Sequence, residues 1–297
     1  MSEVNLGIEP GKYIAAVSGG VDSMVLLDLL SKQRGVEIVV AHFNHGIRPD
    51  SSKDELLVAK MAKKYNLPME AGHGRLGANT SEDQARKARY AFLHSVARKQ
   101  QAEAILTAHH QDDLIETALI NLIRGTGRRG LSAIAVNPDV RRPLLNYPKR
   151  RLLSYARKNR LVWSEDSTNK NDDYLRNYLR NQILPKLSKS KRANLLKISD
   201  KVANNSKAQD ELIAIISHNL TNEGHIDRHK FIELPAEVAD ELLVYWLRDK
   251  DYLSYQRDAI DRLNTVIRTA KPATRHSVGK DLELVVDRRS AYFARVR

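Results

Sequence analysis

The stretch SGGVDS, from Ser18 to Ser23, combines two glycines with two hydroxyls and a carboxylate. An apolar, β-leaning run (13–17) precedes it and an apolar helical run follows it. Glycines allow a backbone to approach a phosphate closely, and a helix start offers free N–H groups and a positive dipole end. Asp22 would repel phosphate unless Mg²⁺ stood between them. The stretch therefore predicts a phosphate cradle, with a plain turn in which Asp22 caps the helix as the alternative.

A second polar segment, TAHHQDDLIETALINLIRGTGRRG, follows another β-leaning run. Asp112 and Glu116 are four residues apart and so share one helix face, just after His109 and His110. This pattern indicates a metal site or a nucleotide-contacting loop, although acids at a helix start are also favoured by the dipole alone. The trailing RGTGRRG places Arg128 and two further arginines among glycines, which suits contact with a phosphate or RNA backbone.

A third segment, HFNHGIRPDSS, brings His42 and His45 to the end of another β-leaning run. Together with His109 they could in principle form a three-histidine zinc site. A magnesium–phosphate site is preferred because it also explains the carboxylates.

A fourth segment, EDSTNKNDDYLRNYLRNQILP, places Arg176 and Arg180 on one helix face. Ion pairs with nearby acids and contacts with a substrate or RNA are both compatible with that spacing.

The elements that must position these segments alternate between strands and helices. The sequence predicts strands within 13–17, 37–43 and 103–109, and helices starting near residue 22 and spanning about 50–65, 82–99 and 112–123. This alternation predicts an α/β fold with an open, mostly parallel, Rossmann-like sheet covered by helices on both faces. Ligands of such sheets bind at the carboxyl ends of the strands, where the first three polar segments fall.

The later part of the sequence predicts a second, smaller domain. Residues 188–269 have mainly helical patterns, and two alternating runs near the end predict a short β-hairpin. The expected division is a first domain over 1–187 and a mainly helical domain over 188–297, within the usual range of roughly 100–200 residues per domain.

The chain is strongly basic, with a formal net charge of +13 over 297 residues. Between residues 124 and 151 there are eight Lys or Arg against one acid, and between 186 and 201 six against one. Clustering of this kind is typical of surfaces that follow a nucleic-acid backbone, whereas a merely basic soluble protein more often mixes the two signs.

The sequence contains no cysteine. Disulfides, thiolate catalysis, iron–sulfur clusters and cysteine-ligated zinc are thereby excluded, and a reducing cytoplasm is the expected compartment. No run of eighteen apolar residues and no leader-like N-terminus is present, so neither a secretory signal nor a membrane span is expected.

Taken together, the segments resemble the tRNA(Ile)-lysidine synthases, a family of PP-loop (N-type) ATP pyrophosphatases. The resemblance is carried, in order, by SGGVDS, HFNHGIRPDSS, SEDQARKARYAFL, TAHHQDDLIETALINLIRGTGRRGL, RPLL and WSEDSTNKNDDYLRNYLRNQILP, and covers about residues 13–187. The C-terminal third resembles the family's helical second domain with a short ending. The resemblance therefore implies a PP-loop catalytic domain over 1–187 and a tRNA-binding domain over 188–297. Longer members carry a further C-terminal domain, which is not expected here.

This resemblance implies a reaction. The wobble cytidine of the isoleucine tRNA with anticodon CAU attacks the α-phosphate of ATP, pyrophosphate leaves, and free L-lysine displaces AMP to give lysidine. The implied cofactors are ATP and Mg²⁺, and the implied partners are this tRNA and free L-lysine, with no membrane; a homodimer is left open.

The resemblance also suggests roles for individual residues. Asp22 and Asp112 are the candidate metal ligands and, with Arg128, the candidate catalytic residues. The nucleotide is expected to contact His42, His109 and the turn formed by Ser18, Gly19, Gly20, Val21, Asp22 and Ser23.

Other PP-loop enzymes remain as alternatives. Thiolation through a cysteine persulfide or an iron–sulfur cluster is excluded by the lack of cysteine. Ammonia-using synthetases act on small nucleotides and do not need so basic a chain. A non-catalytic tRNA-binding module is the alternative from another class, and the intact Ser18, Asp22, Ser23 and Asp112 argue against it.

Overall fold

This computed structural model describes residues 4–46, 51–74, 80, 82–123, 139–164, 175–250, 252, 257–279 and 281–296. The chain forms two compact units, Met1–Ala203 (unit 1) and Asn204–Arg297 (unit 2), whose boundary falls within a single helix, α8. The expected functional division at residue 187 stays a prediction. None of the described helices is long and apolar enough to cross a bilayer.

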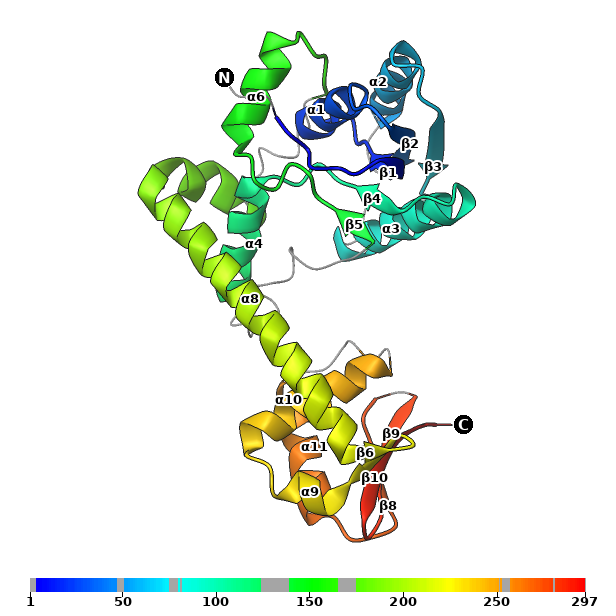
Figure 1. Cartoon of the computed structure of the whole chain (residues 1–297), viewed down its shortest axis with the longest axis vertical. Coiled ribbons are helices and arrows are strands. Elements are labelled where there is room, and N and C mark those ends of the chain that lie inside the picture. The colour runs from blue at the N-terminus through cyan, green and yellow to red at the C-terminus, as the bar shows by residue number, and fades with distance from the viewer. Residues whose placement is uncertain are drawn as a thin grey trace. The chain divides into compact units, whose positions relative to one another are not determined.

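Unit 1 is built on a five-stranded sheet with the order β3-β2-β1-β4-β5, in which every pair is parallel (Figure 1). The strands are β1 Gly11–Ala16, β2 Val36–Asn44, β3 Met69–His73, β4 Ala104–Leu106 and β5 Val140–Arg141. The helices are α1 Val21–Leu30, α2 Ser51–Lys64, α3 Glu82–Lys99, α4 Gln111–Ile123, α6 Lys149–Lys158, α7 Leu175–Tyr178 and α8 Lys189–Leu220. The predicted open parallel sheet is confirmed.

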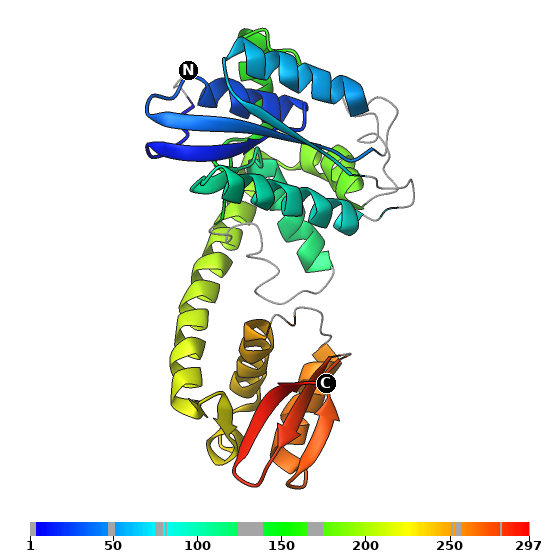
Figure 2. The same ribbon diagram turned by 90° about the vertical axis from the view of Figure 1, so that its right-hand side faces the viewer.

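Helices cover both faces of this sheet (Figure 2). On one face α1, α2 and α6 pack through a core that includes Leu26, Val58 and Leu152. On the other face α3 packs through Leu93 and Val96. Because all of these side chains leave water, the sheet and its helices form a rigid platform for the loops at the strand ends.

The topology brings two of the predicted segments together. From β1 the chain moves outward through β2 to β3, then returns to β4 on the other side of β1. In open α/β sheets the crevice beside such a reversal is where ligands bind. The SGGVDS turn leaves β1 at this point, and His109 and His110 follow β4.

The structure differs from the prediction in two regions. The helix expected before residue 187 is a short α7 followed by a π-helical turn, Leu179–Ile183, and a 3₁₀ turn, Leu184–Lys186. In unit 2 the predicted hairpin is present as β9 Leu282–Val286 and β10 Ser290–Arg295. It belongs to a larger antiparallel sheet with the order β6-β7-β10-β9-β8.

The additional strands of unit 2 are β6 Thr221–Asn222, β7 His225–Asp227 and β8 Thr274–Ser277, and its other helices are α9 Arg228–Ile232, α10 Ala236–Asp249 and α11 Arg257–Thr269. Strands of two to four residues are too short to show the alternation by which a strand is recognised in sequence. The prediction therefore found the hairpin and not the sheet.

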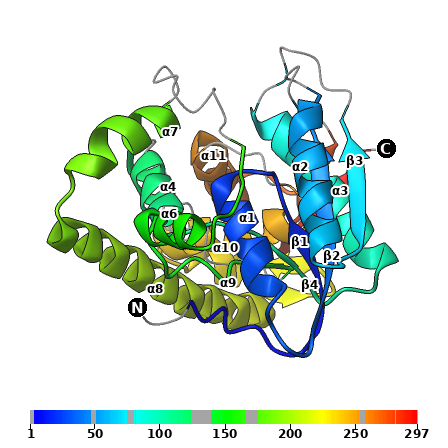
Figure 3. The ribbon, with the colours of Figure 1, turned by 90° about the horizontal axis from the view of Figure 1, so that it is seen from above.

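A buried carboxylate joins α1 to α6. Asp28 is 4% exposed and accepts hydrogen bonds from the hydroxyls of Tyr65 (2.5 Å) and Tyr155 (2.6 Å) and from the Lys32 ammonium (2.6 Å). Burial raises the pKa of Asp28, but these three donors outweigh burial and hold that pKa below its ordinary value. The contact fixes α6 beside α1 (Figure 3).

We expect Asp28→Asn to lower the free energy of unfolding of unit 1 by about 2–3 kcal/mol at pH 7, because hydrogen bonds to a charged group are lost. Since the folded pKa is depressed, this stabilisation is present above the unfolded value and disappears as pH falls through the folded value. Denaturation curves at several pH values should show the difference in free energy of unfolding between wild type and Asp28→Asn decreasing as the pH falls towards 3. Asp200→Asn, which alters an exposed carboxylate, is the control. An equal loss of stability in Asp200→Asn, or a loss in Asp28→Asn that does not depend on pH, would contradict this role of Asp28.

Candidate active site

The SGGVDS turn is organised around the hydroxyl of Ser23, which is buried. Its oxygen accepts hydrogen bonds from the backbone N–H groups of Ser18 (3.2 Å) and Gly19 (3.1 Å), and it donates to the carbonyl of Gly20 (2.8 Å). Gly19 has a φ of +94°, a conformation that side chains disfavour. The Ser23 hydroxyl thus fixes the backbone of the turn, and the positive φ of residue 19 requires a glycine there.

The turn leads directly into the N-terminus of α1. Gly20 is the N-cap residue and supplies no side-chain hydrogen bond to the helix. The first N–H groups of a helix and its dipole together attract anions. The end of β1 therefore presents an uncapped helix start that suits a phosphate.

Asp22, in the first turn of α1, is the acidic member of this site. Its Oδ2 lies 2.5 Å from Nζ of Lys149 and 3.7 Å from Nε2 of His110. Within the described part of the chain its Oδ1 is buried and has no hydrogen-bond partner. Burial raises the pKa of Asp22, but His110 and Lys149 outweigh burial and bring that pKa below its ordinary value. The carboxylate is therefore ionised, with one oxygen unused.

The pKa values of the two histidines after β4 are shifted in opposite directions. Burial lowers the pKa of His109 to about 4, helped by three nearby arginines, and its Nδ1 is 2.8 Å from the hydroxyl of Thr107. Burial also lowers the pKa of His110, but Asp22 and Asp113 outweigh burial and raise that pKa above its ordinary value. His109 is a neutral hydrogen-bonding group, while His110 links two carboxylates.

A second charged cluster continues from His110 along α4. Asp113 Oδ2 is 3.3 Å from His110 Nδ1, and Asp113 Oδ1 accepts a bond from the Arg180 guanidinium at 3.1 Å. Arg180 also donates two bonds of 2.8 Å to the two oxygens of Glu116. Burial raises the pKa of Glu116 despite this partner. Arg180 lies in the π-helical turn, a distortion often found at functional sites.

The remaining predicted residues lie as follows. His42 is buried on β2, with Nδ1 2.8 Å from the carbonyl of Val17, directly before the turn. Asp112 accepts a bond from Arg192 of α8 at 3.1 Å, while its Oδ1 is buried without a partner among the described residues. Arg128 lies outside the described residues, and the roles of all three residues stay predictions.

Three arginines act electrostatically on His109. Arg86 and Arg89 of α3 lie over the ring of Tyr90, at 4.9 and 5.5 Å, and Arg142 follows β5. All three lower the pKa of His109. This group provides positive charge at the same edge of the sheet.

No cluster of three or more His, Asp or Glu in the described ranges is arranged to hold a metal ion by side chains alone. The three-histidine zinc alternative is therefore not supported by the described residues. Magnesium usually takes only one or two protein carboxylates and completes its shell with phosphates and water. The unused Oδ1 of Asp22 fits such an ion.

The sequence interpretation missed Lys149 and Asp113 as members of the site. Lys149 is separated from Asp22 by 127 residues and was counted only within a basic run. Asp113 was passed over because the i, i+4 spacing pointed to Asp112 instead. A usable signal for Asp113 was its spacing from His110, because a carboxylate three residues on caps a helix start, as Asp113 Oδ2 does here by accepting from the His110 N–H.

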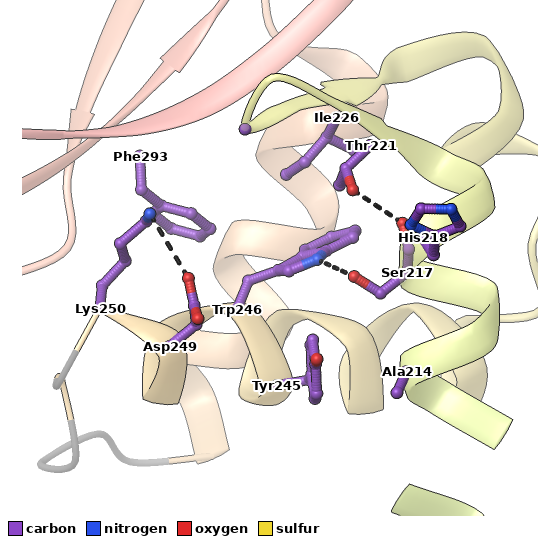
Figure 4. A pocket seen from close by; sticks show the side chains of 11 residues that line it. Ala214, Ser217, His218, Thr221, Ile226, Tyr245, Trp246, Asp249, Lys250 and Phe293 are labelled. Carbon is purple, nitrogen blue, oxygen red and sulfur yellow. Dashed lines mark hydrogen bonds and ion pairs between the residues drawn. The ribbon is translucent and has the colours of Figure 1, made fainter. Parts of the chain in front are cut away.

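Unit 2 contains a hollow of about 360 Å³ between α8, α10 and β10 (Figure 4). Tyr245, Trp246 and Phe293 contribute to its walls. The Trp246 indole donates to the hydroxyl of Ser217 at 2.7 Å, a bond that satisfies both buried groups. The hollow belongs to the packing of unit 2 and holds none of the predicted site residues.

Comparison with protein families identifies the fold of unit 1. The family model described as "PP-loop domain" matches residues 4–187. The chain belongs to the PP-loop family. The solved structure of the U34-tRNA thiolase NcsA from Methanococcus maripaludis is similar, with a TM-score of 0.54, 18% identity and coverage of 65% of this chain and 72% of that one. At that identity the likeness concerns the fold alone.

Curated PP-loop relatives are similar over a larger part of the chain. A tRNA(Ile)-lysidine synthase of Streptococcus sanguinis is 33% identical over 285 residues, covering 93% of this chain and 64% of the relative. That of Thermotoga maritima is 38% identical over 189 residues, covering 60% of this chain and 46% of the relative. The chain thus spans about half to two thirds of the length of these relatives.

Proposed function

We propose that this protein is an ATP-dependent tRNA(Ile)-lysidine synthase. It would adenylate the wobble cytidine of the CAU-anticodon isoleucine tRNA and join free L-lysine to it. The observation that carries the proposal is the glycine turn at the start of α1, where no side chain caps the helix. Beside it lies an ionised Asp22 whose Oδ1 has no hydrogen-bond partner among the described residues. Similarity to curated synthases over 93% of the chain supports this substrate class.

In this proposal the reaction has two steps. The oxygen on carbon two of cytidine bonds to the α-phosphorus of ATP, and the bond from that phosphorus to the bridging oxygen breaks, releasing pyrophosphate. The neutral ε-amine of lysine then bonds to carbon two and gives up a proton, while AMP leaves with the oxygen. Because charge builds on the departing pyrophosphate, donors aimed at it lower the barrier.

The chain's own residues have separate tasks in these steps. The N–H groups at the start of α1 and the hydroxyl of Ser18 would hold the pyrophosphate half of ATP. Asp22 would hold Mg²⁺, which supplies charge neutralisation when bound. His109, being uncharged, would hydrogen-bond to nucleotide or RNA without adding charge to the site.

Positive charge for an RNA backbone is concentrated in unit 1. Residues 204–297 contain 15 basic and 15 acidic side chains, so the whole excess of 13 lies in residues 1–203. The domain predicted over 188–297 owes its positive charge to its first 16 residues, at the start of α8. We therefore expect unit 1 and the N-terminal half of α8 to supply most phosphate contacts, with unit 2 adding shape rather than charge.

An acceptor assay tests the proposal. Purified protein with ATP, Mg²⁺, labelled lysine and the CAU-anticodon isoleucine tRNA should transfer the label to RNA and release AMP and pyrophosphate in equal amounts. Methionine tRNA with the same anticodon is the matched control and should remain unlabelled. ATP turnover on another acceptor, with no labelled isoleucine tRNA, would overturn the proposal. A non-catalytic tRNA-binding module would bind RNA and release no AMP.

A further inference from the structure

Lys149 is the first residue of α6, and its Nζ lies 2.5 Å from Oδ2 of Asp22. The two side chains are 32% and 26% exposed, so the pair lies at the edge of the site and can be reached by a ligand. A lysine side chain ends in a compact cation with three donors on a flexible stem. It can therefore exchange one anion for another without any movement of the backbone.

The backbone that carries Lys149 is fixed on two sides. Leu152 and Ala156 of α6 are fully buried against the α1 face, and Tyr155 is bonded to Asp28 of α1. Just before the helix, the carbonyl of Tyr147 accepts a bond of 3.0 Å from the N–H of Gln111, the first residue of α4. Lys149 is thus held between the helix that follows β1 and the helix that follows β4.

Local helix physics does not explain a lysine at this place. Cations are disfavoured at the N-terminal end of a helix by the dipole, and the first turn of α6 contains no acid. Asp22 neutralises the charge of Lys149, yet only one of its two carboxylate oxygens has a partner among the described residues. A magnesium ion at Asp22 would compete for this carboxylate and leave the ammonium facing the start of α1, where an anion is expected.

We propose that Lys149 binds the pyrophosphate half of ATP. Before nucleotide enters, the ammonium neutralises Asp22; after MgATP enters, it donates to a phosphate oxygen and stays with the pyrophosphate as that group departs. This inference rests on the proposed function for the identity of the nucleotide and adds a residue outside the PP-loop to its binding site. If instead the pair only fastens α6 to α1, Lys149 will have no preference for polyphosphate.

Calorimetric titration with magnesium pyrophosphate and, separately, with AMP distinguishes the two roles. Lys149→Met should weaken pyrophosphate binding about tenfold to hundredfold, the value of a hydrogen bond to a charged group, and change AMP binding less than twofold. Lys149→Arg should retain most of the affinity for pyrophosphate. Arg150→Met alters the next, exposed residue and should leave both affinities unchanged.

Two results would overturn the inference: unchanged pyrophosphate affinity in Lys149→Met, or equal weakening of pyrophosphate and AMP. Lys149→Gln carries the same comparison if Lys149→Met does not fold. The titration needs no tRNA, so its outcome is separate from that of the acceptor assay. Selective loss of pyrophosphate affinity in a protein that makes no lysidine would refute the proposed function and leave the role of Lys149 standing.

Discussion

Asp22→Asn should abolish adenylation while leaving tRNA affinity within about twofold of the wild type. The substitution keeps the size of the side chain and removes the charge that Lys149 and His110 surround. A magnesium ligand would be lost, and Lys149 and His110 would lose the carboxylate that they contact. Losing a single group that stabilises developing charge commonly costs about 10²–10³-fold in rate, and loss of the ion adds to this. Pyrophosphate release measured with tRNA present, beside a filter-binding assay, reports the two quantities separately.

Asp28→Asn is the matched control for this result. It makes the same chemical change in a buried carboxylate on the same helix, but one that bonds to Tyr65 and Tyr155 and not to the turn. Below its melting temperature we expect it to be less stable than the wild type and nearly as active. If Asp22→Asn lost tRNA binding in proportion to adenylation, Asp22 would be a structural residue.

The sequence was sufficient to predict an open parallel sheet and three of its five strands, β1, β2 and β4. Apolar runs before SGGVDS and before His109 are strands because they are short, β-leaning and followed by helical patterns. Once the strands were parallel, their carboxyl ends had to share an edge, and the two polar segments had to meet. The topology therefore explains why the segments that carry Asp22 and His110 meet, and their side chains lie 3.7 Å apart.

Pairings between distant side chains could not be predicted in the same way. Arg180 was expected either to pair with acids near it in sequence or to contact a substrate or RNA, and it pairs with Asp113 and Glu116 of α4. Arg192, counted in a basic run, pairs with Asp112. Such contacts depend on how helices pack and on where a π-helical turn aims a side chain, and neither leaves a periodic signal in the sequence.

Arg180→Met should cost more stability than Asp28→Asn or Arg176→Met. Glu116 is 1% exposed and is held by two hydrogen bonds from Arg180. Breaking a buried ion pair on one side leaves an uncompensated charge and typically costs about 3–5 kcal/mol. Trp163 packs against the core of unit 1, so its fluorescence during urea denaturation, in a Trp246→Phe background, reports the unfolding of that unit.

The response to pH identifies the cause of this loss. Without Arg180, the pKa of Glu116, already raised by burial, should rise further above its unfolded value. A carboxyl whose pKa is raised in the folded state destabilises the protein at pH values above that pKa, and this effect is absent below its unfolded pKa. The difference in free energy of unfolding between wild type and Arg180→Met should therefore decrease as the pH falls from 7 towards 4. Arg180→Met/Glu116→Leu should recover most of the lost stability, because an apolar pair can replace a buried ion pair.

Arg176→Met is the control. The Arg176 guanidinium is 4.0 Å from Glu116 and more exposed than that of Arg180, so its loss should cost less than about 1 kcal/mol. If the loss of stability in Arg180→Met depended neither on pH nor on the added Glu116→Leu substitution, Arg180 would act through packing and not through charge.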